Sequence, residues 1–407
     1  MTAVSTSAKE PAYRWVILLV SAAILGAVMG QMINGISVYL VPLEKTFGWS
    51  RADISFINTI GLIGTAIGSL AIGPIAGRIG IKRVALFGVA MAGATMLAAS
   101  RADALWQFYL LFFFAGAFGG GALSAPLMAL VGNWFVAGAG FAIGVATAGQ
   151  ALGQGMMPFT GALLIESFGW RTALAAQSLL ILVVLLPLTL LLRDAPRAAM
   201  HHSIAAEENP SGLSNRVVTT WLAVAVLLCC TCMSVPLIHL VPLMQSCGIP
   251  APQAGGVLFV MLIVAIAGRV AFGRLADLIG AIPAYLIASG WQTVMVFGFT
   301  YLGKLDTFFI YAAIYGFGYA GVMTALLVTA RNLTDPQHRT TSMGIVVAAG
   351  LAGHGLGGWQ GGFFFDVTGL YTWSYANAAL AGIANLILIS GLWIAVRMKQ
   401  KTALATT

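Results

Sequence analysis

Long apolar segments separated by short polar turns make up most of this 407-residue chain. A helix needs about 20 apolar residues to cross a bilayer, and twelve segments are long and apolar enough. Open strands are excluded because lipid cannot satisfy their backbone groups, and the segments are too long and too uniformly apolar for barrel strands. The expected spans are 15–42, 50–76, 83–100, 104–132, 140–166, 171–192, 217–244, 252–276, 282–303, 306–330, 341–366 and 372–396. The pattern predicts an all-α membrane protein with twelve transmembrane helices.

The second half of the chain repeats the first at an offset of 200 residues. Leu40-Val41-Pro42-Leu43 recurs as Leu240-Val241-Pro242-Leu243, and Glu166 falls on Asp366. Most of the other matches are glycines, so the repeat mainly constrains how the helices pack and bend, and only secondarily the chemistry of the two halves. Two related halves suit a carrier that holds its substrate between them while they tilt. We expect a six-helix half over 1–192, a cytoplasmic linker over 193–216 and a second six-helix half over 217–407.

Composition and charge agree with a membrane location. Hydrophobic residues make up 59% of the chain and charged residues 8%, against about 25% charged residues in soluble domains. Fourteen of the twenty Lys and Arg residues fall on the side of the two termini, five fall on the other side, and Arg269 lies inside a span. This bias places both termini in the cytoplasm. It also explains the net charge of +8 without any nucleic-acid partner.

No cofactor, metal site or enzymatic centre is expected. Cys229, Cys230 and Cys232 are closely spaced, but a zinc site needs four converging ligands, and on an apolar helix these residues are expected to pack against neighbours. His201-His202 in the linker is expected to be solvated. The glycine run Gly119–Gly121 follows no strand and precedes no P-loop lysine, which argues against nucleotide binding.

Arg269, near the middle of the eighth span, is the main candidate for substrate binding. An arginine at a helix centre costs about 2.5 to 3.5 kcal/mol, and all twelve carboxylates fall in loops, tails or span ends. An unpaired guanidinium favours a carboxylate ligand, and a single cation favours a monocarboxylate over a dicarboxylate, a sugar or a cationic drug. The alternative is that Arg269 snorkels towards Arg274 and Asp277 at the end of the span.

Other polar residues inside the spans are weaker candidates. His239 and its repeat mate Tyr39 are expected in the outer third of the cavity, as an external gate, and His239 or His354 could carry a coupled proton. Such residues also serve simply to hold helices together. The neutral candidates for substrate contact are Asn34, Ser124, Gln150, Tyr315 and Tyr319.

Two glycine-rich loops resemble the loop motif of the major facilitator superfamily. The first copy lacks the usual acid at Gly77, and the second lacks the trailing basic residues. The residues expected to act in this conformational motif are Gly73, Arg78, Gly80, Arg83, Gly273, Arg274, Asp277 and Gly280. The resemblance implies the twelve-helix fold of that superfamily, built from two six-helix pseudo-repeats.

Within the superfamily, four stretches are similar to monocarboxylate transporters and oxalate:formate antiporters: 168–171, 239–242, 268–277 and 365–371. The resemblance implies that Arg269 binds the substrate carboxylate. Asn34 stands where animal monocarboxylate transporters have a lysine, and Ala265 where they have an acid. Gly350 stands where oxalate carriers have a second cation, which argues against a dicarboxylate substrate.

The sequence therefore predicts secondary active transport of small monocarboxylates, similar to lactate or pyruvate, by proton-coupled alternating access. Two alternatives remain: an organic-anion exchanger of the oxalate:formate type, or a facilitator-family carrier of another small solute. The expected partners are a small organic anion, protons and the lipid bilayer. The family resemblance implies a monomer, and the compact loops suggest a bacterial inner membrane.

Overall fold

The computed structural model describes residues 12–135, 139–194, 213–334 and 338–406, and all regular structure within them is helical. The first part of the chain forms α1 (Arg14–Gly30), α2 (Ile36–Phe47), α3 (Arg51–Ile79), α4 (Ile81–Ala99), α5 (Leu105–Phe114), α6 (Ala122–Trp134), α7 (Ala139–Leu180) and α8 (Leu186–Thr189). The second part forms α9 (Asn215–Ser246), α10 (Ala251–Ile279), α11 (Ala281–Val296), α12 (Leu305–Leu333), α13 (Arg339–Thr368) and α14 (Tyr371–Thr406).

The helices account for the twelve predicted spans. Ten helical stretches of the described chain are long and apolar enough to cross a membrane. One of them, Phe141–Thr189, covers the fifth and sixth predicted spans, because two helices follow each other there across the bend at Gly169 with no loop between them. The glycine-rich α13 covers the eleventh span and is not among the ten.

Backbone conformation shows why glycines are the residues that match most often across the repeat. Within the described residues, positive φ angles occur at six glycines, which form three pairs offset by 200 residues: Gly48 with Gly248, Gly80 with Gly280, and Gly169 with Gly369. Side chains are disfavoured at these φ values. Each pair turns the chain at the same place in the two repeats.

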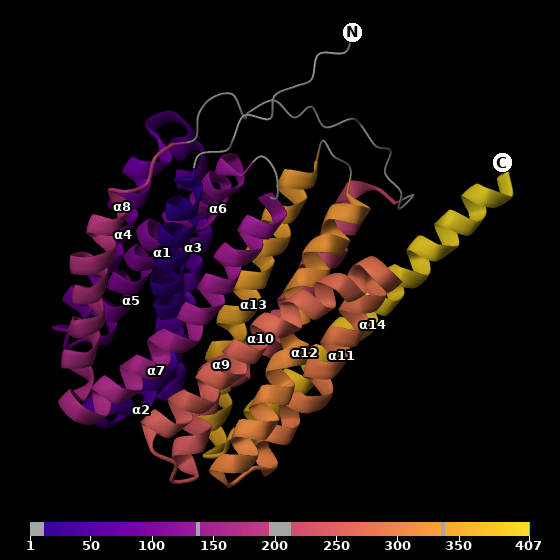
Figure 1. Ribbon diagram of the computed structural model, residues 1–407. Helices are drawn as coiled ribbons and strands as arrows, with labels where there is room; N and C mark the ends of the chain where they lie inside the picture. The colour runs from indigo at the N-terminus through magenta and orange to yellow at the C-terminus, as the bar shows by residue number, and fades with distance from the viewer. Residues whose placement is uncertain (1–11, 136–138, 195–212, 335–337, 407) are drawn as a thin grey trace.

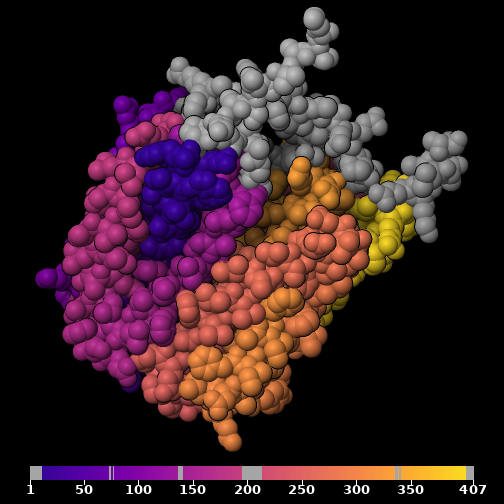
Figure 2. Space-filling model, viewed as in Figure 1, coloured from indigo at the N-terminus to yellow at the C-terminus, as the bar shows by residue number. Residues whose placement is uncertain are grey.

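Helices α1–α8 gather on one side of the molecule and α9–α14 on the other, and the two groups meet along a diagonal seam (Figures 1 and 2). Contacts across the seam join α3 to α13, α7 to α10, and α2 to α9. Helix α1 begins and α14 ends at the same end of the bundle (Figure 1). We call this the terminal end, and the other the opposite end.

Glycines also permit close approach of helices. A side chain at Gly153 of α7 would collide with the backbone of Gly26 in α1, and one at Gly30 would collide with the backbone of Gly153. Small residues at such crossings allow membrane helices to pack through their backbones. This contact places α7, which carries Gln150 and Gln154, directly beside the interrupted first helix.

Candidate functional site

A cavity of about 490 Å³ lies between the two groups of helices. Its wall is mainly apolar, with a few polar side chains contributed by α7, α10, α12 and α13. Near the terminal end it is lined by Gly144, Leu327 and Val347, which lie close to the ends of their helices there. The polar residues in its wall include Thr147, Gln150, Gln154, Arg269, Tyr319, Thr324 and His354.

Arg269 is half-buried in α10 and lines this cavity. Its Nη1 donates to the Thr147 carbonyl oxygen at 3.5 Å, which is at the long limit for a hydrogen bond. Among the described residues, no carboxylate oxygen lies within 4.0 Å of the guanidinium. Asp277, the acid on the same helix, is exposed. The guanidinium therefore offers donors and an uncompensated charge to a ligand in the cavity.

Tyr319, on α12, lines the cavity within electrostatic range of Arg269. Its ring stacks on that of Tyr315, with centroids 5.4 Å apart and an interplanar angle of 14°. Tyr315 is fully buried behind it and does not line the cavity. Of the two tyrosines predicted to contact substrate, the structure therefore places only Tyr319 at the cavity wall, with Tyr315 supporting its ring.

The first membrane-spanning segment is interrupted by a π-helical turn, Gln31–Gly35, a feature frequent at functional sites. The turn leaves backbone carbonyl groups available to side chains. Asn58 donates to the carbonyl oxygens of Met32 and Ile33, at 2.7 and 3.1 Å. The ring of His354, from α13, lies near the Ile33 backbone.

Asn34, in the same turn, is buried and donates through Nδ2 to the carbonyl oxygen of Gln154 at 3.3 Å. It does not line the cavity, although its neighbour Ile33 does. Ser124, on α6, also lies outside the lining. Gln150 lines the cavity as expected of a substrate contact, and Gln154, its neighbour one turn deeper, lines it as well.

His239 lies outside the cavity lining, in a hydrogen-bonded network towards the opposite end. Its Nε2 is 2.7 Å from the Gly358 carbonyl oxygen, and its Nδ1 is 3.4 Å from the Tyr371 hydroxyl. The same hydroxyl accepts from Arg51 Nη1 at 2.9 Å. Tyr39, the repeat mate of His239, instead donates to Gln177 Oε1 at 2.7 Å, a contact within the first group of helices. The two mates thus have different surroundings.

The network around Arg51 joins α3 to the second group of helices at the opposite end. Asp366 accepts hydrogen bonds from the backbone N–H groups of Arg51 and Ala52, at 2.9 and 2.7 Å. The Arg51 guanidinium pairs with Glu44 at 3.0 Å and lies over the Phe365 ring at 3.7 Å. We call these residues, with Tyr371 and His239, the end latch.

Sequence reasoning did not single out Arg51 or Tyr371 as functional residues. Two sequence features point to this region: Glu166 matches Asp366 across the repeat, and the stretch 365–371 is similar to monocarboxylate transporters. Distance along the chain hid the contact, because Arg51 and Asp366 are 315 residues apart.

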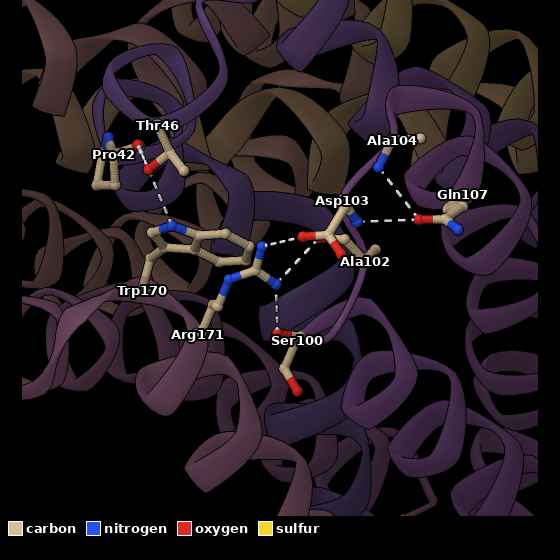
Figure 3. Close-up of polar contacts among 9 residues, drawn as sticks. All are labelled: Pro42, Thr46, Ser100, Ala102, Asp103, Ala104, Gln107, Trp170 and Arg171. Carbon is tan, nitrogen blue, oxygen red and sulfur yellow. Dashed lines mark hydrogen bonds and ion pairs between the residues drawn. The ribbon is translucent and has the colours of Figure 1, made fainter.

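A second cluster at the opposite end stays within the first group of helices (Figure 3). Arg171 pairs with Asp103 at 2.5 Å and donates to the carbonyl oxygens of Ser100 and Ala102, each at 3.0 Å. Trp170 donates to Thr46 at 3.1 Å. These contacts hold the bend of α7 against neighbouring turns of the first group of helices, and none of them crosses the seam.

The loop motifs lie at the terminal end. Gly80 and Gly280, with φ of 94° and 95°, end α3 and α10. After the first turn, the Ile81 N–H donates to Asp194 at 3.0 Å, and Lys82 donates to the Leu190 carbonyl at 2.6 Å. A side chain at Gly273 would make ordinary contact with Thr324. The environment of Gly73 lies outside what the structure describes. The charged motif residues are exposed: Arg78, Arg83, Arg274 and Asp277.

Comparison with known proteins gives a consistent picture. A model of the Major Facilitator Superfamily matches residues 20–308 and 220–406. Monocarboxylate transporter 13 of Rattus norvegicus is 26% identical over 398 residues, which is 94% of this chain and 90% of the relative. A gallate transporter of Pseudomonas putida is 30% identical over 191 residues, 46% of this chain and 41% of the relative. The crystal structure of the nucleoside transporter NupG has a similar fold, with a TM-score of 0.77 at 13% identity, covering 93% of this chain and 99% of that one.

Proposed function

Because this chain belongs to the major facilitator superfamily, and is therefore an integral membrane transporter, we propose that it carries monocarboxylates by alternating access. The observation that supports this most directly is Arg269, a half-buried cation in the wall of a cavity between the two halves, with no carboxylate partner among the described residues. A carboxylate would supply the missing charge and accept two parallel hydrogen bonds from the guanidinium. The similarity to monocarboxylate transporter 13 supports the same class of cargo.

Tyr319 and Gln150 would complete the carboxylate end of the site, since both line the cavity on helices that face α10. Substrate would enter from the terminal end, because the end latch holds the opposite end together. With both termini in the cytoplasm, as the charge distribution predicts, this arrangement would be the inward-facing state of the transport cycle. A bacterial inner membrane is the proposed location.

Proton coupling is part of the proposal. His354 lines the cavity, whereas His239 belongs to the end latch. A proton carried with the substrate would therefore bind more directly at His354, while His239 would act on the opening of the opposite end. Uptake with and without an imposed pH gradient distinguishes symport from exchange.

The test of the carboxylate site is uptake of radiolabelled lactate, pyruvate and longer monocarboxylates into proteoliposomes containing the purified full chain. Arg269→Gln is expected to lower uptake more than about tenfold, since a hydrogen-bonded charge pair contributes about 1.5 to 3 kcal/mol. Arg269→Lys keeps the charge but loses the bidentate geometry, so it should retain an intermediate rate. Wild-type uptake by Arg269→Gln would disprove the assignment.

A further inference from the structure

The cavity has polar groups at two levels, separated by an apolar wall. At one level, Arg269 approaches the Thr147 carbonyl of α7. Gln154 lies seven residues further along the same helix, which corresponds to about 10 Å at 1.5 Å per residue. Asn34 donates to the Gln154 carbonyl, and the His354 ring lies near the backbone of Ile33, the residue before Asn34. Gln154 and His354 therefore form a second polar level, deeper than Arg269.

His354 at this second level has an unused hydrogen-bonding atom. Its side chain is 5% exposed, and Nε2 has no hydrogen-bond partner in the described part of the chain. Depending on the tautomer, Nε2 donates or accepts one hydrogen bond. A buried ring nitrogen without a partner is costly, so a ligand hydroxyl, which can both donate and accept a hydrogen bond at Nε2, would gain affinity.

The wall between the two levels carries apolar side chains, Ile266 from α10 and Leu351 from α13. Met233 and Leu237 of α9 line the cavity at the depth of His354 and beyond, since Thr231 and Ser234 of the same helix lie against Gly357 of α13. The volume of about 490 Å³ falls within the range of about 300 to 1,000 Å³ found for pockets that hold drug-sized ligands. A three-carbon acid bound to Arg269 would leave both the apolar wall and the second polar level without contacts.

From this arrangement we infer that the preferred cargo is an elongated monocarboxylate with an apolar, aromatic-sized middle and a hydroxyl group at its far end. The inference rests on the proposed function, because it uses the carboxylate bound at Arg269 as its fixed point. The far hydroxyl hydrogen-bonds with His354 Nε2 and lies beside the Gln154 side chain. The middle of the molecule contacts the apolar wall.

The experiment compares phenylpropionate with its para-hydroxy derivative, as competitors of a labelled acid in proteoliposomes that contain the full chain. The two acids share a carboxylate and a ring and differ only in the distal hydroxyl. The hydroxylated acid is expected to compete at least about fivefold better, in line with one added hydrogen bond, and lactate to compete more weakly than either. His354→Ala is expected to bring the ratio for the pair close to one, while His354→Gln, which keeps a hydrogen-bonding side chain, retains part of the preference.

Equal competition by the two acids in the wild type would overturn the inference, as would an unchanged ratio in His354→Ala. If that variant does not fold, the wild-type ratio decides alone. Arg269→Gln separates the two proposals, because loss of all carboxylate uptake in this variant keeps the proposed function whatever the ratio for the pair. Retained uptake of both acids would instead disprove the carboxylate site.

Discussion

One cation in a largely apolar cavity determines the charge that a ligand must bring. Arg269 lies in that cavity without a carboxylate partner among the described residues, and Gly350 lines the same cavity. A Cβ atom added at Gly350 would meet Cys230 at 3.5 Å and Val226 at 3.6 Å, which is ordinary van der Waals contact. The backbone at Gly350 can therefore carry a side chain at the cavity wall.

Gly350→Lys is expected to change the charge preference of the transporter. A second cation in the cavity would stabilise a dicarboxylate, since two unit charges attract by several kcal/mol at short range in a partly buried site. The uptake ratio of succinate to a monocarboxylate of similar length should rise about tenfold. Radiolabelled uptake by the two proteins, under one set of conditions, measures this ratio.

Gly350→Met is the matched control, because it adds an unbranched side chain of similar length without a charge. Its ratio should stay near that of the wild type. A rise of similar size in the methionine variant would mean that the shape of the side chain causes the change, and an unchanged ratio in the lysine variant would mean that position 350 does not share a ligand with Arg269.

Arg269 could be singled out from the sequence because a charge inside a span is rare and costly, and the structure places this residue in the cavity wall. The neutral polar residues gave no such signal. Tyr315 and Tyr319 lie one helical turn apart, yet only Tyr319 lines the cavity. Asn34 bonds to the Gln154 backbone instead of lining the cavity. Which neutral residues face the cavity depends on helix rotation and on the π-helical turn, and neither can be derived from local sequence.

At the scale of elements, the crossing of α1 and α7 depends on backbone contact between glycines. Gly153→Val is expected to lower the free energy of unfolding by about 1 to 3 kcal/mol, the usual cost of overpacking, because the added side chain would collide with the Gly26 backbone. Thermal unfolding of the purified protein, followed by intrinsic fluorescence, would show a lower midpoint.

Gly144→Val is the matched control on the same helix, since a Cβ atom at Gly144 meets no atom within 4 Å. The two substitutions change the helix propensity by the same amount, so the difference between their unfolding midpoints measures the effect of the helix crossing. Equal midpoints for the two variants would show that α1 and α7 can separate without cost.

At the scale of the whole molecule, the repeat could be predicted from the sequence because bends need glycine, and three offset glycine pairs do adopt positive φ. The twelve spans could also be predicted from local sequence, since each helix must be apolar enough to cross a bilayer by itself. The contacts across the seam could not be predicted. They join residues that are hundreds of positions apart, such as Thr59 and Gly355, whose hydroxyl and carbonyl oxygens are 2.8 Å apart.

The end latch should control which end of the cavity is open. Asp366 is the contact that is most easily tested, because its carboxylate accepts hydrogen bonds from the backbone N–H groups of Arg51 and Ala52 at the first turn of α3.

In Asp366→Asn the negative charge that favours a helix N-terminus is lost, and the amide oxygen can accept hydrogen bonds from only part of the same N–H groups. Hydrogen–deuterium exchange of the peptide that contains the first turn of α3 is expected to rise severalfold, with faster exchange also in the segment around Tyr371. The matched control is Glu166→Gln, since Glu166 is the repeat mate of Asp366 and equally exposed but, among the described residues, accepts no hydrogen bond from α3 as Asp366 does, and exchange at α3 should not change. If Asp366→Asn leaves exchange at α3 unaltered, the latch does not hold the opposite end closed, and the barrier to opening must lie in the apolar contacts between α3 and α13.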